Sequence, residues 1–513
     1  MGEYAHGEGQ YNTADGQYAH AEGYNTKATG DIDAKITVDD NITNKVSNHS
    51  EGYGTVANGG ASHAEGMGTK ASGKTAHAEG YQTEATGENA HSEGDRNKAS
   101  GKSSHAEGSS TDATGTQSHA EGKDTEASGE CSHASGIETK AFGKASYSEG
   151  YQTESHNFAS HSEGCGNIAS GVGAHAEGGY FDYNVGMTSN IASGDSSHAE
   201  GFGTKATGDA SHTEGKSTQA SGAQSHAEGY NTKASKSNTH AEGSSTKAFG
   251  VNSHAEGNGT SATGESSHAE GQGNAWGSTA GTKGLASGKY SHSEGYETVA
   301  KGESSHSEGR STIAEGNNSH AEGYGTKTIA DNAHAEGNSC EAGNTGHAEG
   351  YNTKAIPAEG KWIAHAEGNS TKASGEASHA EGGNTVASGD YSHAGGRNTV
   401  AANRSQTVIG EFNDNKSNTL FEVGNGTGED VYIEYKGTGP ILSEKNRYNA
   451  FEVYRDGHAE LRSQTKADGT IPDNAVVIYK TLKNLIAFGT LDPTTDELPA
   501  EQQNCLFYVK ISE

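Results

Sequence analysis

The chain has 513 residues, a formal net charge of −32 and only 29% hydrophobic residues, and its 76 glycines far outnumber its 5 prolines. The glycines follow no three-residue period, which excludes a collagen triple helix. Because 68 acidic residues face only 36 basic ones, we expect neither a nucleic-acid partner nor a membrane partner.

An internal repeat overturns the disorder that such a composition would otherwise predict. Each fourteen-residue period is two sevens of the form x-x-[ST]-x-A-x-G, as in 102–108 followed by 109–115. The alternating stretch suits a strand and the Gly-x-x suits a turn, so one period predicts one coil of a parallel β-solenoid. The first uninterrupted run of histidines is His49, His63, His77, His91, His105, His119 and His133, after which Tyr147 takes the next position.

Strand alternation sorts the side chains of each coil into two faces. Ser104, Ala106 and Gly108 are expected to point inward, while His105 and Glu107 point outward. A fourteen-residue coil has room inside for little beyond methyl and hydroxyl groups. This explains why the first 400 residues contain a single leucine.

The outward positions of the two half-repeats differ in character. In the second half-repeat the residue varies freely, which is typical of solvated surface, whereas in the first half it is almost always His followed by Glu two residues later. Nothing inside a coil requires those residues, so we expect a repeated environment, most economically another copy of the chain aligned in register. The predicted interface ladder is His63, Glu65, His77, Glu79, His91, Glu93, His105, Glu107, His119 and Glu121.

The repeats resemble the β-roll heads of trimeric autotransporter adhesins, which have fourteen-residue coils and small inward residues. They are still more similar to the S-H-A-E-G and T-K-A-S-G repeats of tail fibres and appendages of phages that infect Gram-positive bacteria. The resemblance covers about 1–403 and implies an all-β, left-handed parallel β-solenoid that forms a homotrimeric rod. The chain departs from the adhesin heads in placing His77 and Glu79 where those commonly carry apolar residues, so the implied interface is polar and hydrogen-bonded.

The function that this resemblance implies is a structural and attachment fibre of a phage tail or related particle. Its implied partners are further copies of the chain, other tail or particle proteins, and a glycan or protein on the host surface. The expected location is the virion or the extracellular surface, with no visible signal peptide. Two alternatives stay open: a trimeric bacterial surface adhesin, and a polysaccharide-degrading tailspike, which would need a cleft with two carboxylates.

The fourteen-residue period slips near 31–45, 179–187, 273–282 and 356–364, where we expect loops that leave the coils. Exposed aromatic side chains on such loops can stack on a receptor, or they can fold back over the coil surface. Tyrosines just after the first turn glycine, as at Tyr24, are expected to pack on neighbouring turns. The candidate receptor-contact residues are Tyr180, Phe181, Tyr183, Trp276 and Trp362.

Ordinary apolar density returns after Arg404, so 404–513 is expected to be a separate β-rich domain that serves as a tip or a trimerisation module. Residues 449–461 predict a hairpin that turns at Asp456-Gly457. This segment resembles the N-A-F-x-V-x-x-D-G stretches of phage-fibre C-terminal modules.

His and Glu two residues apart could indicate metal binding or acid–base catalysis. An active site is assembled once or a few times, whereas this pair recurs along the whole repeat region, so we expect no enzyme, no cofactor and no metal site, but a hydrogen-bonded ladder. The 27 histidines predict an assembly that responds to pH between about 5 and 7, in a direction left open. Cys131, Cys165, Cys340 and Cys505 lack zinc or disulfide spacing and are expected to be free thiols.

Overall fold

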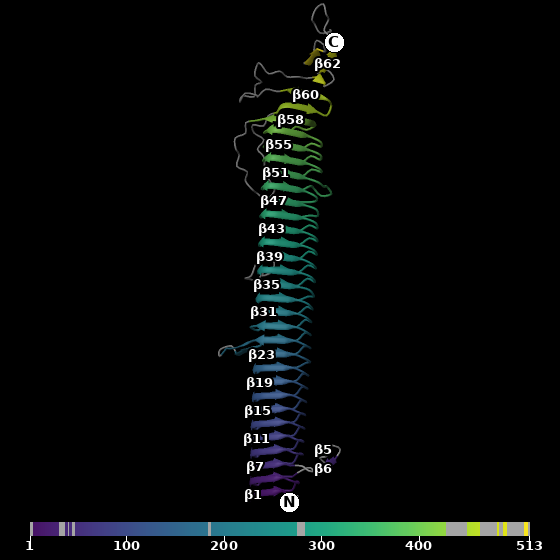
Figure 1. Cartoon of the computed structure of the whole chain (residues 1–513). Coiled ribbons are helices and arrows are strands. Elements are labelled where there is room, and N and C mark those ends of the chain that lie inside the picture. The colour runs from purple at the N-terminus through teal and green to yellow at the C-terminus, as the bar shows by residue number, and fades with distance from the viewer. Residues whose placement is uncertain are drawn as a thin grey trace, which may run out of the picture. The chain divides into compact units, whose positions relative to one another are not determined.

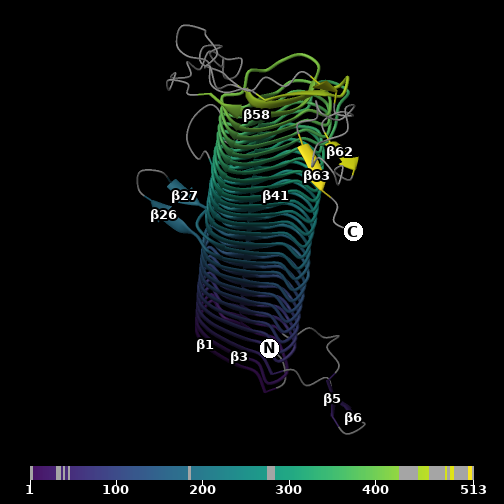
Figure 2. The same cartoon turned by 90° about the horizontal axis from the view of Figure 1, so that it is seen from above.

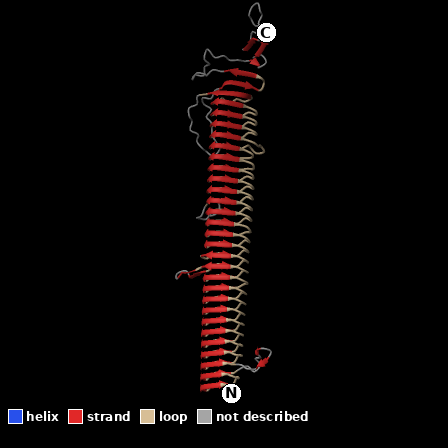
Figure 3. Ribbon diagram, in the orientation of Figure 1, coloured by secondary structure: helices blue, strands red, loops and turns tan. Residues whose placement is uncertain are grey.

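The computed structural model describes residues 4–29, 36–38, 41–43, 47–182, 186–273, 283–426, 449–461, 480–481, 486–489 and 507–510. The chain divides into two units, Met1–Gly259 and Thr260–Glu513. All regular elements in the described ranges are β-strands, coloured red in Figure 3. Accordingly, those ranges contain no helix that could span a bilayer.

In the first unit each coil consists of a long strand, a turn, a two-residue strand and a second turn, and the coils are stacked one on the next (Figure 1). The long strands are β1 (His6–Gln10), β3 (His20–Tyr24), β7 (His49–Tyr53), β9 (His63–Met67), β11 (His77–Tyr81), β13 (His91–Asp95), β15 (His105–Ser109), β17 (His119–Lys123), β19 (His133–Ile137), β21 (Tyr147–Tyr151), β23 (His161–Cys165), β25 (His175–Gly178), β29 (His198–Gly201), β31 (His212–Lys216), β33 (His226–Tyr230), β35 (His240–Ser244) and β37 (His254–Asn258). The short strands are β2 (Thr13–Ala14), β4 (Lys27–Ala28), β8 (Val56–Ala57), β10 (Lys70–Ala71), β12 (Glu84–Ala85), β14 (Lys98–Ala99), β16 (Asp112–Ala113), β18 (Glu126–Ala127), β20 (Lys140–Ala141), β22 (Glu154–Ser155), β24 (Ile168–Ala169), β28 (Ile191–Ala192), β30 (Lys205–Ala206), β32 (Gln219–Ala220), β34 (Lys233–Ala234) and β36 (Lys247–Ala248).

Consecutive long strands pair in parallel with equivalent residues opposite each other, as His91 is opposite His105 on β13 and β15. The backbone hydrogen bonds run between coils, for example from His91 N–H to the Ser104 carbonyl at 2.9 Å. Short strands pair in the same register, so that Ala99 is opposite Ala113. The parallel β-solenoid predicted from the fourteen-residue period is therefore confirmed.

The interior of a coil is made of small side chains, as expected. Ala106 and Ala113 are fully buried, and Ser104 and Thr111 are at most 1% exposed. The inward serine also closes its own turn, because Ser104 Oγ donates to the Gly101 carbonyl at 2.8 Å. A β-carbon on the buried Gly115 would collide with the backbone of the next coil, so a side chain there requires the turn to shift, as in the coil where Asn157 holds the equivalent position.

Gly108 departs from the predicted alternation, because it is exposed instead of inward-facing. Its φ of 111° lies in a region that side chains disfavour, and a β-carbon there would collide with the Gly122 carbonyl oxygen. The inward–outward alternation therefore ends at Glu107. Many of the described turns also hold a residue in the left-handed conformation just before the inward residue, such as Ser103 before Ser104 and Ser110 before Thr111.

Two of the expected loops carry antiparallel hairpins: β5 (Ile36–Val38) with β6 (Asn41–Thr43), and β26 (Tyr180–Asp182) with β27 (Gly186–Thr188). Figure 2 shows β26 and β27 projecting from the side of the first unit's coils. The coils on either side of this insertion stay in register, with His175 opposite His198. The expected loop at 273–282 lies outside the described residues from 274 onward, and 356–364 is a connection without strands.

The second unit repeats the same coil. Its short strands are β38 (Ser261–Ala262), β40 (Leu285–Ala286), β42 (Val299–Ala300), β44 (Ile313–Ala314), β46 (Lys327–Thr328), β48 (Glu341–Ala342), β50 (Lys354–Ala355), β52 (Lys372–Ala373), β54 (Val386–Ala387) and β56 (Val400–Ala401). Its long strands are β39 (His268–Gln272), β41 (His292–Tyr296), β43 (His306–Arg310), β45 (His320–Tyr324), β47 (His334–Asn338), β49 (His347–Tyr351), β51 (His365–Asn369), β53 (His379–Gly383), β55 (His393–Arg397), β57 (Thr407–Glu411) and β58 (Thr419–Asn425).

The parallel ladder continues past residue 403, where the sequence places the domain boundary. Thr407 on β57 pairs with His393, and β58 pairs in parallel with β57. The pairing then becomes antiparallel with β59 (Asn449–Tyr454) and β60 (His458–Leu461), which confirms the predicted hairpin. The remaining described strands are β61 (Lys480–Thr481), β62 (Ile486–Gly489) and β63 (Phe507–Lys510).

A buried polar network lies where the ladder changes from parallel to antiparallel. Glu422 on β58 and Glu452 on β59 are opposite each other and fully buried. Gln406 donates to Glu422 at 2.9 Å, and Lys416 Nζ lies 3.1 Å from a Glu452 oxygen. Burial raises the pKa of Glu422. These long polar side chains replace the alanines and serines of the preceding coils.

Candidate functional site: a row of stacked histidines

The ten residues of the predicted interface ladder lie on five consecutive long strands, β9, β11, β13, β15 and β17. Because each strand pairs residue for residue with the next, histidine is opposite histidine and glutamate is opposite glutamate. The structure therefore brings all ten together in two neighbouring rows on the outer face of the long strands. We call these the histidine row and the glutamate row, and we use the same names for the equivalent positions in the other coils of each unit.

Successive imidazoles of the histidine row are stacked. The rings of His77, His91, His105 and His119 lie 4.7–4.8 Å apart with interplanar angles of 3–4°. Strand spacing in a parallel sheet is about 4.8 Å, so equal rotamers on paired strands are enough to produce this stack. The row is disturbed at His133, which is tilted by 38°, and at Tyr147, whose ring is inclined by 61° to that of His133.

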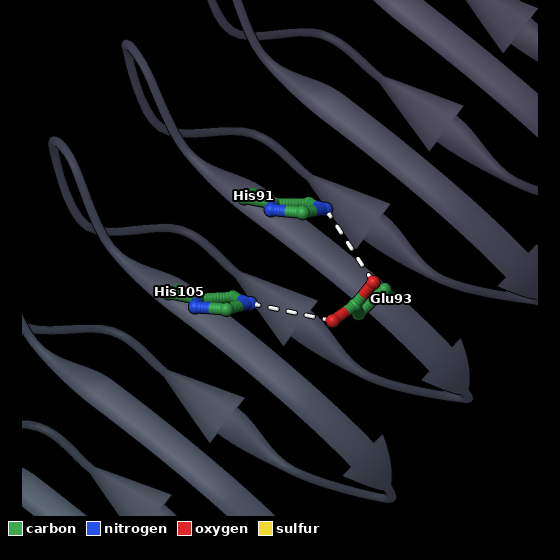
Figure 4. Close-up of side chains that lie close together, drawn as sticks. All are labelled: His91, Glu93 and His105. Atoms are coloured by element: carbon green, nitrogen blue, oxygen red, sulfur yellow. Dashed lines mark ion pairs between the residues drawn. The ribbon is translucent and has the colours of Figure 1, made fainter.

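Each glutamate lies between the imidazoles of two coils. Figure 4 shows Glu93 with one carboxylate oxygen 3.9 Å from His91 Nε2 and the other 3.8 Å from His105 Nε2. Such distances exceed those of hydrogen bonds. Within one chain, then, this part of the expected hydrogen-bonded ladder is absent, although His198 does lie 3.0 Å from Glu177.

The imidazoles are partly exposed, but their Nε2 atoms are not. The His91 and His105 side chains are 36% and 33% exposed, yet the Nε2 atoms of both are buried and make no hydrogen bond with the described residues. The stacked rings above and below and the neighbouring carboxylate cover each nitrogen. Native proteins rarely leave a buried polar atom unpaired, so its recurrence in many coils calls for a physical explanation.

Burial and stacking both oppose protonation of the histidine row. The pKa of His77 is lowered, first by burial and second by the positive charge that His91 would carry, while Glu79 and Glu65 act in the opposite direction. His119 shows the same balance, with its pKa lowered by burial and then by His133. Burial and the neighbouring histidines thus favour neutral imidazoles at His77 and His119 at neutral pH.

The outer face of the short strands differs from the histidine row. It carries lysines and acidic residues of varying order, and these form ion pairs between coils. Glu315, for example, lies 2.9 Å from Lys301 Nζ and 3.2 Å from Lys327 Nζ. Exposed pairs of this kind contribute little to stability, and this face has the varied charges of solvated surface.

The candidate receptor-contact residues can be placed only in part. Tyr180 is 56% exposed and lies 6.2 Å, ring to ring, from Phe202, and Trp362 is 52% exposed. Trp276, Tyr183 and the Phe181 side chain lie outside the described residues. The structure does not gather the described aromatic residues into one site.

Tyrosines at the first turn pack along neighbouring coils while staying partly exposed. Tyr24 and Tyr53 are stacked 5.1 Å apart. In the second unit the Arg310 guanidinium lies 5.3 Å from the Tyr296 ring and 5.6 Å from the Tyr324 ring. These contacts match the expected packing between turns.

Sequence reasoning missed the buried carboxylates Glu422 and Glu452. The signal was the repeated Phe-Glu-Val in both strands, but an alternating strand pattern does not show that the middle residue is fully buried. The thiol prediction is confirmed for Cys131, Cys165 and Cys340, which are free. Cys505 lies outside the described residues.

Comparison of the chain with protein-family models and with curated proteins finds no match to either.

Proposed function

We propose that the protein is a homotrimeric attachment fibre of a phage tail or a related particle, in which the histidine rows of three chains face one another. The observation that carries this proposal is the uniform histidine row itself, in which the Nε2 atoms of His63, His77, His91, His105 and His119 are buried but make no hydrogen bond with the described residues. The number three and the phage origin are supported by the resemblance of the repeats.

Parallel association in register explains why the row is uniform. When copies lie side by side at the same height, each coil meets its own equivalents, so one solution to packing is repeated in every coil. His63, His77 and His119 all have lowered pKa values, and neutral rings can be brought together without desolvating a charge. The short-strand face, with its mixed charges, lacks this uniformity.

Attachment is the role that fits such an assembly. Ladders of backbone hydrogen bonds make a stiff spacer, and its insertions present exposed aromatic side chains such as Tyr180 and Trp362. Aromatic rings on projecting loops are suited to stacking on sugars or on a protein surface of the host. The spacer would hold a C-terminal tip away from the particle.

The proposal is tested by measuring the mass of the purified full chain with light scattering and imaging it by electron microscopy. We expect about 158 kDa, three times 52.7 kDa, and a slender particle with threefold cross-section. A folded chain that stays at 52.7 kDa would contradict the proposal. Release of oligosaccharide from host capsule would instead support the tailspike alternative.

Paired variants locate the interface. His77→Glu, His91→Glu and His105→Glu together place like charges at the proposed contact and should yield monomers that retain β-sheet circular dichroism. Their matched control changes lysines of the short-strand face and should stay trimeric. The control substitutions are Lys70→Glu, Lys98→Glu and Lys140→Glu.

A further inference from the structure

The histidine and glutamate rows place metal-ligating atoms of two coils close together. His91 Nε2, a Glu93 carboxylate oxygen and His105 Nε2 all lie within 4.8 Å of one another. Equivalent groups recur along the first unit, at His105, Glu107 and His119 and again at His175, Glu177 and His198. Two imidazole nitrogens and one carboxylate oxygen are a donor set that suits Zn²⁺ and similar divalent transition metals.

The distances in the group of His91, Glu93 and His105 suit a metal better than a hydrogen bond. Ligands about 2.0–2.1 Å from a tetrahedral ion lie about 3.4 Å from each other. The carboxylate oxygens of Glu93 lie 3.9 and 3.8 Å from the two imidazole nitrogens, which is too long for a hydrogen bond. Because an Nε2 lone pair lies in the plane of its ring, the stacked rings of His91 and His105, now parallel and 4.7 Å apart, must tilt out of the stack to bring all three donors into range of one ion.

The buried Nε2 atoms supply a second, independent observation. Those of His91, His105 and His119 are shielded from solvent and make no hydrogen bond with the described part of the chain. A neutral imidazole nitrogen that carries no proton offers one lone pair, which must be paired with a donor or a cation. A metal held between two coils would pair with two such nitrogens at once.

We propose that the histidine and glutamate rows bind divalent transition-metal ions, each held by two histidines of consecutive coils and the glutamate between them. The fourth position is filled by water or by a donor from a neighbouring chain. The sites rest on the geometry of a single chain, so they do not depend on the trimer. The sequence favours a purely hydrogen-bonded ladder, and the proposal departs from that expectation because the distances are too long.

Sharing of histidines limits how many ions can bind. His105 belongs both to the group with His91 and to the group with His119. Because one Nε2 lone pair binds one metal, adjacent groups cannot be filled together. The expected occupancy in an uninterrupted run is about one ion for every two coils, or about three ions for the seven histidines from His49 to His133.

The natural interruption of the row should not bind metal. Ser135 takes the glutamate position beside His133, and Tyr147 takes the next histidine position. A hydroxyl and a phenol replace a carboxylate and an imidazole there, so the donor set is incomplete. The number of bound ions should therefore be counted separately for the histidines before and after this interruption.

The test uses the full chain after removal of metals with a chelator. Zn²⁺ is titrated by calorimetry, and Co²⁺ serves as a spectroscopic probe because tetrahedral Co²⁺ absorbs visible light strongly. We expect saturable binding of several ions per chain, tetrahedral Co²⁺ bands, and a Zn²⁺-induced rise in Tm that EDTA reverses. Mg²⁺ and Ca²⁺, which prefer all-oxygen sites, should not compete.

A five-residue variant of the glutamate row identifies the ligands. Because it removes all five carboxylates of the glutamate row between His63 and His133, it should lose about two ions per chain and keep its circular dichroism. The variant is Glu65→Gln, Glu79→Gln, Glu93→Gln, Glu107→Gln and Glu121→Gln. The matched control is Glu84→Gln, Glu88→Gln, Asp112→Asn, Glu126→Gln and Glu130→Gln, in the same coils but outside the row.

Each other outcome overturns the proposal. An equal loss of ions in the control would assign binding to general surface charge. Competition by Mg²⁺ would assign it to carboxylates alone, and unsaturable uptake without tetrahedral Co²⁺ bands would mean that no built site exists. Mass measured on the same samples judges the trimer separately, so the two proposals can fail independently.

Discussion

The imidazole rings of His292 and His306 lie parallel, 4.8 Å apart and inclined by only 1°. They belong to consecutive coils whose residues pair one to one. A positive charge on one ring would therefore lie against the face of the next. We therefore expect the stacking of these rings to affect how the stability of the chain changes with pH.

We predict that the metal-free chain loses stability as the pH falls below about 6.5. The pKa of His306 is lowered by burial and then by His292 and His320, while Glu308 and Glu294 oppose the shift. The unfolded chain therefore binds protons at higher pH than the folded chain, so acidification favours unfolding. Only well above pH 6.5 is the His306 ring neutral in both states, and there this contribution no longer changes.

The measurement is the urea midpoint at pH 7.5, 6.5 and 5.5 in the presence of a chelator. Replacing His292, His306 and His320 with glutamine should flatten the profile. A midpoint that stays constant or rises on acidification would show that the neighbouring glutamates outweigh burial and stacking.

Substitution of two glycines in one turn should have unequal effects on stability. Gly201 has a φ of 111°, and a β-carbon there would collide with the Gly215 carbonyl oxygen, so Gly201→Ala should lower the free energy of unfolding by at least about 1–3 kcal/mol. Gly203 has a φ of 66° with open space around it, and Asn231 adopts the equivalent conformation. Gly203→Asn should therefore be within about 1 kcal/mol of wild type. Urea denaturation of both variants measures the difference, and equal effects would refute it.

The size limit on the coil interior can be tested at adjacent residues. Ala113 is fully buried, whereas Thr114 is exposed. Ala113→Leu should destabilise the chain by about 1–3 kcal/mol or more, because added methylenes cannot be accommodated between coils. Thr114→Leu should change stability by no more than about 0.5 kcal/mol. Thermal unfolding of each variant measures the change in stability. An Ala113→Leu variant as stable as wild type would mean that the interior can expand.

The stability lost when a buried threonine is replaced by valine should depend on the residue five positions earlier in the chain. Thr298 Oγ1 lies 2.8 Å from Ser293 Oγ, whereas the Thr111 hydroxyl, with Ala106 in the corresponding position, is buried without a hydrogen-bond partner among the described residues. Thr298→Val should cost about 1–3 kcal/mol because it strands the serine hydroxyl. Thr111→Val should be neutral or stabilising.

A double-mutant cycle completes this test. Adding Ser293→Ala to Thr298→Val should restore most of the lost stability, since no polar group is then left unpaired. Additive losses in the double variant would mean that the two hydroxyls do not act as a pair.

Much of the architecture could be predicted from the sequence, because a strict period places equivalent residues opposite each other in every coil. The inward orientation of Ser104 and Ala106 followed from strand alternation and from the small volume of a fourteen-residue coil. The Asp456-Gly457 hairpin followed from local turn chemistry. Alternation failed at Gly108, because glycine can adopt a backbone conformation that other residues avoid.

The sequence by itself determined the coil, its register and the rows of histidine and glutamate, since these depend only on periodicity and residue size. Only the tertiary structure decided that His91 and His105 stack face to face, that Glu93 lies between them beyond hydrogen-bond distance, and that their Nε2 atoms are buried. Those features depend on side-chain rotamers and on the spacing between coils. The sequence pattern alone specifies neither the rotamers nor the spacing, because both are set when the coils pack on one another.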